Sequence, residues 1–330
     1  MSKTLVTGGS GFLGSHLVDR LSALGENVRV LVRPTSNIEH LKKVKNVELM
    51  FGDLGDVRSL EKATAGIEYI FHCAALASDW GSWNDFYHVN VKCLHNLLNV
   101  LVNGNIKRLI HISTTDVYGY PDYPADEDTP YNSRGILYCD TKIEGEKLVW
   151  EYFKKHGLPV TVIRPVNIYG PRSITFGYDI AKLLKEGSMV HISNGNKPAG
   201  LAYVGNVVDA IISSLENKKS IGMAYNISDG SDITWKRYVN YLAKITDNPR
   251  PKIVIPYKIA YFSGWLMEKY YSHFPIKGKP LLTRMAAELF GTNQGFPIEK
   301  ARRELGYDPK VGFGEGMYRV KMWLEGIGIF

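Results

Sequence analysis

The sequence predicts an α/β protein in which a doubly wound parallel sheet is joined to a smaller α/β lobe at the C-terminal end. Two observations support this prediction. The first 165 residues alternate short β-rich runs with helical stretches, which is typical of a parallel sheet with helices on both faces. Beyond Pro171 the alternation breaks into short helices and a few strands. We therefore expect one domain over residues 1–170 and a smaller lobe over residues 171–330, some of whose segments return to the main sheet.

Apolar, β-branched runs mark the expected strands, and amphipathic stretches mark the helices. The strands of the main sheet are predicted at 4–7, 28–32, 47–50, 69–73, 108–112 and 160–163. Between them we expect helices that begin near Phe12, Ile38, Val57, Asn84 and Arg134. The smaller lobe is predicted to hold helices at 178–185, 207–216 and 235–245. An aromatic-rich stretch follows at 257–274.

Composition and charge exclude several classes of protein. Apolar residues make up 45% of the 330 residues, and no apolar run reaches the roughly 18–20 residues that cross a bilayer. The first apolar stretch is too short for a secretory signal, and three widely spaced cysteines predict neither disulfides nor a metal site. We therefore expect a reduced, cytoplasmic protein. The net charge of +7 is spread along the chain, so it favours anionic small molecules over nucleic acid.

A glycine-rich segment, TGGSGFLG, follows the first predicted strand and opens a helix. Its glycines permit a tight turn, a close approach of backbone to a pyrophosphate, and close packing of helix on strand. The helix start then offers free N–H groups to the phosphates. This pattern predicts a site for a dinucleotide cofactor. Its expected contacts are Gly8, Ser10, Gly11, Phe12, Leu13 and Gly14.

The end of the second predicted strand bears on which nicotinamide cofactor is used. Val32 stands where an NAD site carries an acidic residue, and Arg33 follows it. NADP(H) is therefore favoured, and NAD(H) stays possible. Asp53 and Leu54, after the third strand, fit a contact to the adenine, although an ordinary Asp turn explains Asp53 nearly as well.

Tyr138 and Lys142 are the expected catalytic pair, because residues four apart share one face of a helix. A free tyrosine has a pKa of about 10. We expect the lysine and the cationic nicotinamide to lower this pKa toward the working range. Ser113 and Thr114 end the fifth predicted strand and place a hydroxyl donor beside the tyrosine.

Together these motifs resemble the extended short-chain dehydrogenase/reductases, within the NAD-dependent epimerase/dehydratase superfamily, along nearly the whole chain. The resemblance implies a Rossmann-type fold in which Tyr138 moves the hydroxyl proton and Lys142 holds the ribose and tunes the tyrosine. Thr114 would hydrogen-bond the carbonyl oxygen, with Ser113 as the fallback. Further motif positions implied for the cofactor are Ala74, Ala75, Asn90 and Pro165. Those implied for the substrate are Trp80, Thr115, Asp116, Asn167 and Tyr203.

Departures from the family patterns limit which of the family's reactions we expect for this chain. Thr115 replaces one member of the acid pair of the 4,6-dehydratases and leaves only Asp116, so dehydration is not expected. Ala199 stands where nucleotide-sugar enzymes tend to carry an arginine that grips the diphosphate. That group could instead be bound by Arg172, Lys197 or Arg237.

Two segments, 78–81 and 203–208, look closer to the 3β-hydroxysteroid dehydrogenase and ketone reductase branch. The aromatic stretch would suit an apolar substrate as a lid, or it packs as ordinary core. Trp80 and Trp83 would lie near the mouth of the nicotinamide site, or act structurally. The candidate lid residues are Tyr257, Tyr261, Phe262, Trp265, Met267, Tyr270, Tyr271 and Phe274.

The predicted function is an NAD(P)-dependent oxidoreductase that interconverts a secondary alcohol and a ketone. Its substrate is expected to be a small molecule that is apolar or bulky, like a sterol. One alternative is a nucleotide-sugar 4-epimerase with tightly bound NAD. A second is a non-catalytic NADP(H)-sensing module, against which the intact Tyr138 and Lys142 argue. The stretches 84–103 and 134–155 resemble helices that pair across a two-fold axis in this family, so a homodimer is expected.

Overall fold

A seven-stranded sheet forms the centre of the protein. The computed structural model describes residues 3–121, 123–274 and 276–329. Its strands run in the order β10-β6-β5-β4-β1-β2-β3, and every neighbouring pair is parallel. Their bounds are β1 Thr4–Thr7, β2 Val28–Val32, β3 Val47–Phe51, β4 Tyr69–His72, β5 Arg108–Ile112, β6 Val160–Pro165 and β10 Ala224–Ile227.

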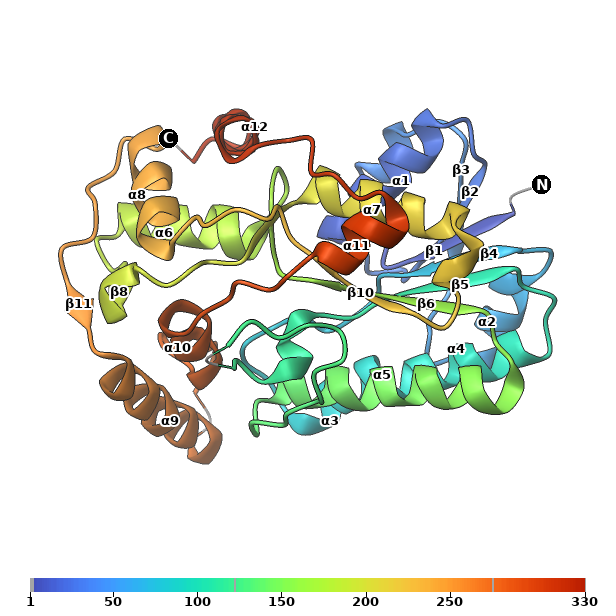
Figure 1. Ribbon diagram of the computed structural model, residues 1–330, viewed down its shortest axis with the longest axis horizontal. Coiled ribbons are helices and arrows are strands. Elements are labelled where there is room, and N and C mark those ends of the chain that lie inside the picture. Colours follow the sequence, from blue (N-terminus) through green and yellow to red (C-terminus); the bar gives the residue numbers. More distant parts are fainter. Residues whose placement is uncertain (1–2, 122, 275, 330) are drawn as a thin grey trace.

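Helices cover both faces of this sheet, which is why every residue of β1, β5 and β6 is buried. On one face lie α2 (Val57–Thr64), α3 (Trp83–Tyr87), α4 (Cys93–Val102) and α5 (Leu137–His156). The other face carries α1 (Phe12–Ala23), α7 (Val204–Glu216) and α11 (Glu299–Leu305) (Figure 1). The doubly wound parallel fold predicted from the sequence is confirmed.

The direction of winding reverses between β1 and β4, which is where such sheets bind ligands at their carboxyl ends. The loop after β1 and the loop after β4 meet there, and Cys73 N donates to Thr7 O at 3.1 Å. The cofactor loop predicted from the glycines therefore lies at the switch point of the sheet.

A second group of elements lies beyond the carboxyl ends of the strands (Figure 1). Two small parallel pairs join β7 (Asn167–Tyr169) to β9 (Leu201–Tyr203) and β8 (His191–Ile192) to β11 (Val254–Ile255). Trp235 is buried in this group, where its ring packs 4.2 Å from that of Phe290 and its Nε1 donates to Leu289 O at 2.7 Å. The helices are α6 Ile180–Lys185, α8 Trp235–Ile245, α9 Tyr257–His273, α10 Arg284–Gly291 and α12 Phe313–Gly326.

The prediction of a helix that begins near Ile38 is wrong. That segment holds only a short 3₁₀ turn, Leu41–Lys43, between β2 and β3. Leu41 is its one fully buried side chain, and Asn46 adopts the left-handed conformation (φ 57°) just before β3. A single apolar anchor cannot stabilise a helix face, so the segment remains a loop. Among the described residues no helix is long and apolar enough to cross a membrane.

Two buried histidines pack side by side in the middle of the sheet. His72 of β4 and His111 of β5 stack with ring centroids 5.5 Å apart, and His72 Nδ1 is hydrogen-bonded to Thr7 Oγ1 at 2.8 Å. Burial, and then the charge of Lys142, lowers the pKa of His72 to about 3. The same two causes, with His72 itself, hold the pKa of His111 well below its usual value. Both rings are therefore neutral in the folded protein at physiological pH.

These neutral histidines predict acid sensitivity. Below about pH 6.5 they take up protons in the unfolded chain but not in the folded one, so stability falls as the pH falls from there toward about 3. Each such proton costs about 1.4 kcal/mol per pH unit. We expect His111→Phe, which keeps a ring against His72, to reduce the slope of unfolding free energy against pH. Urea titrations between pH 5 and 7 measure this slope.

The exposed His156→Gln variant is the matched control and should keep the wild-type slope. An unchanged slope in His111→Phe would show that this imidazole is protonated in the folded state.

Candidate active site

The glycine loop is built for a close backbone approach. Gly8 has φ +72°, and a Cβ there would lie 2.6 Å from Ala74 N. Gly11 N donates to Gly8 O at 3.0 Å and closes the turn, while a Cβ on Gly14 would overlap Gly8 O. Gly9, which the sequence analysis passed over, is also required, because a Cβ there would overlap Val30 of β2.

The loop leaves the start of α1 open. Gly11 is the N-cap residue and supplies no side-chain cap, so the first N–H groups of α1 are free for an anion. Ser10 and Gly11 are exposed, whereas Phe12 and Leu13 are half-buried. These residues fit the pyrophosphate of a dinucleotide.

Asn90 braces the loop after β4. Its Oδ1 accepts from Leu76 N at 2.8 Å, and its Nδ2 donates to Leu76 O at 3.2 Å and Thr141 Oγ1 at 3.1 Å. These bonds occupy the amide that the family resemblance assigned to the cofactor. Asn90 thereby positions the chain that follows the half-buried Ala74 and Ala75.

Arg33 and Asp53 follow two paired strand ends, because Val32 of β2 is in register with Phe51 of β3. The Arg33 side chain is exposed, and its backbone N–H donates to Ser36 Oγ at 3.2 Å. Asp53 Oδ1 accepts from Gly55 N at 2.7 Å, so Asp53 does form the ordinary Asp turn. Leu54 is half-buried against the core below.

Tyr138, Lys142 and Thr114 converge at the carboxyl end of β5. Tyr138 is hydrogen-bonded to the side chain of Thr114, and Lys142 Nζ donates to Ile112 O at 2.7 Å. The neighbouring Ser113 Oγ instead donates to Glu146 Oε2 at 2.5 Å. Successive residues of a strand point to opposite sides, so only Thr114 of the two hydroxyl residues lies beside Tyr138.

The expected lowering of the Tyr138 pKa by Lys142 is wrong for the protein alone. Burial raises the pKa of Tyr138, and the nearby Asp116 and Cys139 raise it further, while the Thr114 hydrogen bond acts in the opposite direction. Lys142, whose ammonium donates to Ile112 O at 2.7 Å, is not among the groups that lower the pKa of Tyr138. Burial lowers the pKa of Lys142 itself to about 8. Tyr138 is therefore held in its protonated form.

Asp116 is a buried carboxyl at the same point. Burial raises its pKa to about 6 against the hydrogen bonds from Thr114 and Tyr120. Tyr120 is itself buried and adopts a left-handed backbone conformation (φ 57°) that non-glycine residues rarely tolerate. Thr115 is buried beside Asp116. An acid that titrates near neutrality thus adjoins both candidate catalytic hydroxyls.

The segment after β4 reaches across to the smaller lobe. The ring of Trp80 meets that of Tyr271 of α9 edge to face, with centroids 6.1 Å apart. Asp79 forms an ion pair with Lys279 at 3.3 Å and accepts from Thr283 Oγ1 at 3.3 Å. Trp83 lies elsewhere, half-exposed on α3. Trp80, but not Trp83, therefore joins the two parts of the protein.

Asn167 and Tyr203 hold the lobe strands in place. Asn167 Nδ2 donates to Ala199 O at 2.7 Å. The Tyr203 hydroxyl accepts from Arg319 at 3.3 Å, and that guanidinium lies 5.5 Å over its ring. Pro165 is buried at the end of β6. The polar groups of Asn167 and Tyr203 are thus already bonded within the protein.

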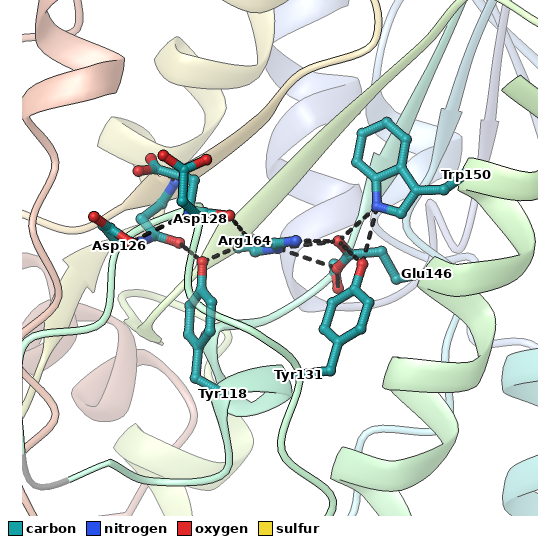
Figure 2. Close-up of polar contacts among 10 residues, drawn as sticks. Tyr118, Asp126, Asp128, Tyr131, Glu146, Trp150 and Arg164 are labelled. Atoms are coloured by element: carbon teal, nitrogen blue, oxygen red, sulfur yellow. Dashed lines mark hydrogen bonds and ion pairs between the residues drawn. The ribbon is translucent and has the colours of Figure 1, made fainter. Parts of the chain in front are cut away.

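A buried ion pair that the sequence analysis missed supports this site from below. Arg164 of β6 meets Glu146 of α5 through Nε at 3.1 and 3.2 Å and through Nη2 at 2.5 Å. Figure 2 shows the guanidinium between Tyr118 on one side and Glu146 with Tyr131 on the other. Glu146 follows Lys142 by the same four residues that separate Lys142 from Tyr138, which was the available signal.

Comparisons with known proteins agree with this geometry. Residues 4–228 match the model of the NAD dependent epimerase/dehydratase family. A 2-alkyl-3-oxoalkanoate reductase of Stenotrophomonas maltophilia is 30% identical over 97% of this chain and 98% of its own. A 3-beta-hydroxysteroid dehydrogenase of Mycolicibacterium neoaurum is 28% identical over 94% of this chain and 87% of its own.

Among solved structures, the protein gox2253 superposes with a TM-score of 0.84 at 26% identity, covering all of both chains. A UDP-glucose 4-epimerase of Thermotoga maritima gives a TM-score of 0.79 at 24% identity over 98% of this chain and 99% of its own. The second likeness concerns the fold alone.

The chain belongs to the NAD dependent epimerase/dehydratase family, and it is an enzyme of the extended short-chain dehydrogenase/reductase type. The resemblance to the 3β-hydroxysteroid dehydrogenase and ketone reductase branch is confirmed by these relatives.

Removing one charge of the buried pair should be costly. We expect Glu146→Gln to lower the free energy of unfolding by about 3–5 kcal/mol, because Arg164 is left as an uncompensated buried cation. Urea unfolding at neutral pH measures this loss. Glu151→Gln, which breaks the exposed pair with Lys155 on the same helix, is the control and should have no measurable effect. Equal stability of the two variants would disprove the supporting role.

Proposed function

We propose that this protein is an NADP(H)-dependent oxidoreductase that interconverts a secondary alcohol and a ketone on an apolar or bulky substrate. The observation that carries the proposal is the convergence of Tyr138, Thr114 and Lys142 at the carboxyl end of β5. Ketone reduction needs a group that donates a proton to the carbonyl oxygen and a second group that orients this oxygen, and two hydroxyl groups can serve these purposes.

The reductive direction follows from the state of each group. The cofactor, when bound, supplies the hydride to the carbonyl carbon. Tyr138 donates its proton to the carbonyl oxygen as negative charge develops there, and burial keeps Tyr138 protonated for this step. Thr114 orients that oxygen by a hydrogen bond. Lys142, whose pKa is about 8, carries positive charge at neutral pH and would bind the ribose of the cofactor, the role that the family resemblance implies.

The glycine loop fits the cofactor that this chemistry requires. A Cβ at Gly8 or Gly14 would fill the space that the backbone leaves, and the first N–H groups of α1 are uncapped. Arg33 supports NADP(H) over NAD(H), since an exposed guanidinium at the end of β2 can pair with a 2′-phosphate.

An apolar substrate is supported by the aromatic contact between Trp80 and Tyr271 and by two relatives, which are named a 2-alkyl-3-oxoalkanoate reductase and a 3-beta-hydroxysteroid dehydrogenase. We propose that residues beyond Pro171, apart from those that pack on the main sheet, form the substrate lobe. Trp80, Asp116 and Thr115 are then the residues of the main domain nearest the substrate.

The 4-epimerase alternative is disfavoured, because such an enzyme must bind the diphosphate of a nucleotide sugar and few cations here are free to do so. Ala199 is fully buried, and its carbonyl is bonded to Asn167. Arg172 is committed to Asp19 at 2.7 Å, and Arg237 lies over the ring of Phe313. Of the three cations named from the sequence, Lys197 and Arg237 are exposed, and Lys197 is the one without a contact named here. A non-catalytic sensor would not need Tyr138, Thr114 and Lys142 together.

We also propose the homodimer expected from the sequence, through α4 and α5. Exposed residues on these helices are mainly polar or charged, and the half-exposed Trp83 lies close by on α3, which packs against α5. A reducing, cytoplasmic setting is proposed because all three cysteines are free thiols.

Tyr138→Phe tests the reaction. We expect turnover of a long-chain alkyl ketone or a 3-ketosteroid with NADPH to fall by at least about 100-fold, since the proton donor is lost. Binding of NADPH should be unchanged. Tyr318→Phe, at an exposed tyrosine of α12, is the control and should keep wild-type turnover. Steady-state assays with nucleotide titrations measure both quantities.

Full turnover in Tyr138→Phe would remove this residue from the mechanism. Stoichiometric NAD released on denaturing the purified wild-type protein would favour the epimerase instead, because that enzyme recycles its cofactor in place.

Arg33→Ala tests the cofactor preference. We expect NADPH affinity to fall about tenfold or more, which is the usual effect of losing a charged hydrogen bond to a phosphate, while NADH affinity stays the same. Calorimetric titration with each nucleotide measures the affinities. Arg250→Ala, at an exposed arginine of the smaller lobe, should change neither. An equal effect on both nucleotides would contradict a 2′-phosphate contact.

A further inference from the structure

Helix α9 (Tyr257–His273) presents its apolar side chains to solvent. Its two buried residues are Ala260 and Gly264, and Gly264 lies so close to α10 that a Cβ would come within 2.7 Å of Thr283 C. The small residues therefore face the protein. Phe262 is 57% exposed and Leu266 is 48% exposed, with Ile259, Trp265 and Tyr270 also exposed around them. This is the reverse of a helix that covers a core.

The apolar surface continues on both sides of α9. Ile253 and Val254 precede the helix, and Phe274, Ile276 and Leu281 follow it. These segments with α9, called here the α9 face, hold 10 of the 20 large exposed hydrophobic residues among those that the structure describes. Such a concentration marks a binding surface and not the scattered apolar residues of an ordinary exterior.

Four members of the predicted lid lie on the α9 face and point outward: Phe262, Trp265, Tyr270 and Phe274. The sequence left two interpretations of this stretch open, a lid over an apolar substrate or ordinary core, and these four side chains are not packed as core. Tyr257, Tyr261, Met267 and Tyr271 are half-buried on the inner side of the helix.

The charges around the α9 face are almost all positive. Between residues 251 and 281 there are five lysines, all exposed, and a single acid. That acid, Glu268, is paired with Arg284 at 2.6 Å on the inner side, and Lys279 is paired with Asp79. The remaining lysines are Lys252, Lys258, Lys269 and Lys277. An apolar, aromatic surface thus carries an unbalanced positive rim.

We propose that the α9 face docks this enzyme on the surface of an anionic lipid bilayer. Exposed aromatic and aliphatic side chains would enter the headgroup region, where such rings are favoured, and the lysines would pair with lipid phosphates and carboxylates. A second copy of the chain is a poorer occupant, because a two-fold contact would bring the same lysines together. Figure 1 shows α9 at the periphery of the molecule, clear of the central sheet.

The inner side of the same helix adjoins the candidate substrate segment. Tyr271 packs on Trp80, and Asp79 holds both Lys279 and Thr283. A docked α9 would therefore set the loop after β4 near the bilayer, from which an apolar substrate can be taken up. Docking itself does not depend on the proposed reaction.

Vesicle flotation tests the proposal without any substrate. Full-length protein is mixed with vesicles of phosphatidylcholine that contain roughly one third phosphatidylserine, and with vesicles of phosphatidylcholine alone. We expect co-flotation with the anionic vesicles, weaker binding to the neutral ones, and release by added salt. The double variant Phe262→Glu with Leu266→Glu should lose at least about tenfold of the binding, because two buried contacts become charges repelled by the lipid.

The matched control is Tyr318→Glu with Met322→Glu on α12, two residues four apart that are 59% and 50% exposed. It should float like the wild type. Thermal unfolding and NADPH binding verify that both variants are folded. Failure of the wild type to bind anionic vesicles would overturn the proposal. So would a molar mass, measured by light scattering, that falls only in the α9 variant, because the face would then join copies of the chain.

Discussion

The ion pair between Arg164 and Glu146 fixes the position of α5 on the sheet. Both charges are buried, which is tolerable because their hydrogen-bonding capacity is used: Glu146 also accepts from Ser113, Tyr131 and Trp150. Arg164 further donates to the Tyr118 hydroxyl (Figure 2). That hydroxyl in turn donates to Asn226 Oδ1 of β10 at 2.8 Å. Since Lys142 and Tyr138 lie one and two turns before Glu146 on the same helix face, fixing Glu146 fixes the residues that we assign to catalysis.

The same pair also sets the electrostatics above it. Glu146 raises the pKa of Lys142 by its charge, but Arg164 largely neutralises that carboxylate, so burial prevails and the pKa of Lys142 falls to about 8. On the other side of Tyr138, Asp116 has a pKa of about 6, so it is mostly ionised at physiological pH and its negative charge disfavours a tyrosinate. These surroundings thus keep Tyr138 protonated in the protein alone, which suits a group that donates its proton during the reaction.

Local patterns were enough to predict six of the seven strands of the main sheet, the glycine loop, and Tyr138 with Lys142 on one helix. The seventh strand, β10, was expected only as an unspecified segment returning to the sheet. Features that depend on contacts between segments far apart in the sequence could not be predicted. The sequence left Ser113 open as an alternative to Thr114, and it did not predict the contact between Asn90 and Leu76, because both depend on contacts between segments far apart in the sequence. The helix predicted near Ile38 does not form, because Leu41 is the one residue of the short turn found there that is buried against the core.

Helix α9 shows the same limit most clearly. Its aromatic composition is compatible with a lid over a pocket or with an outer surface, and its periodicity does not distinguish them. The distinction lies in Ala260 and Gly264, whose lack of bulk lets α10 approach on one side and turns Phe262 and Leu266 to the other. Because Tyr271 and Lys279 then contact Trp80 and Asp79, movement of α9 at a lipid surface would be transmitted directly to the loop beside the proposed nicotinamide site.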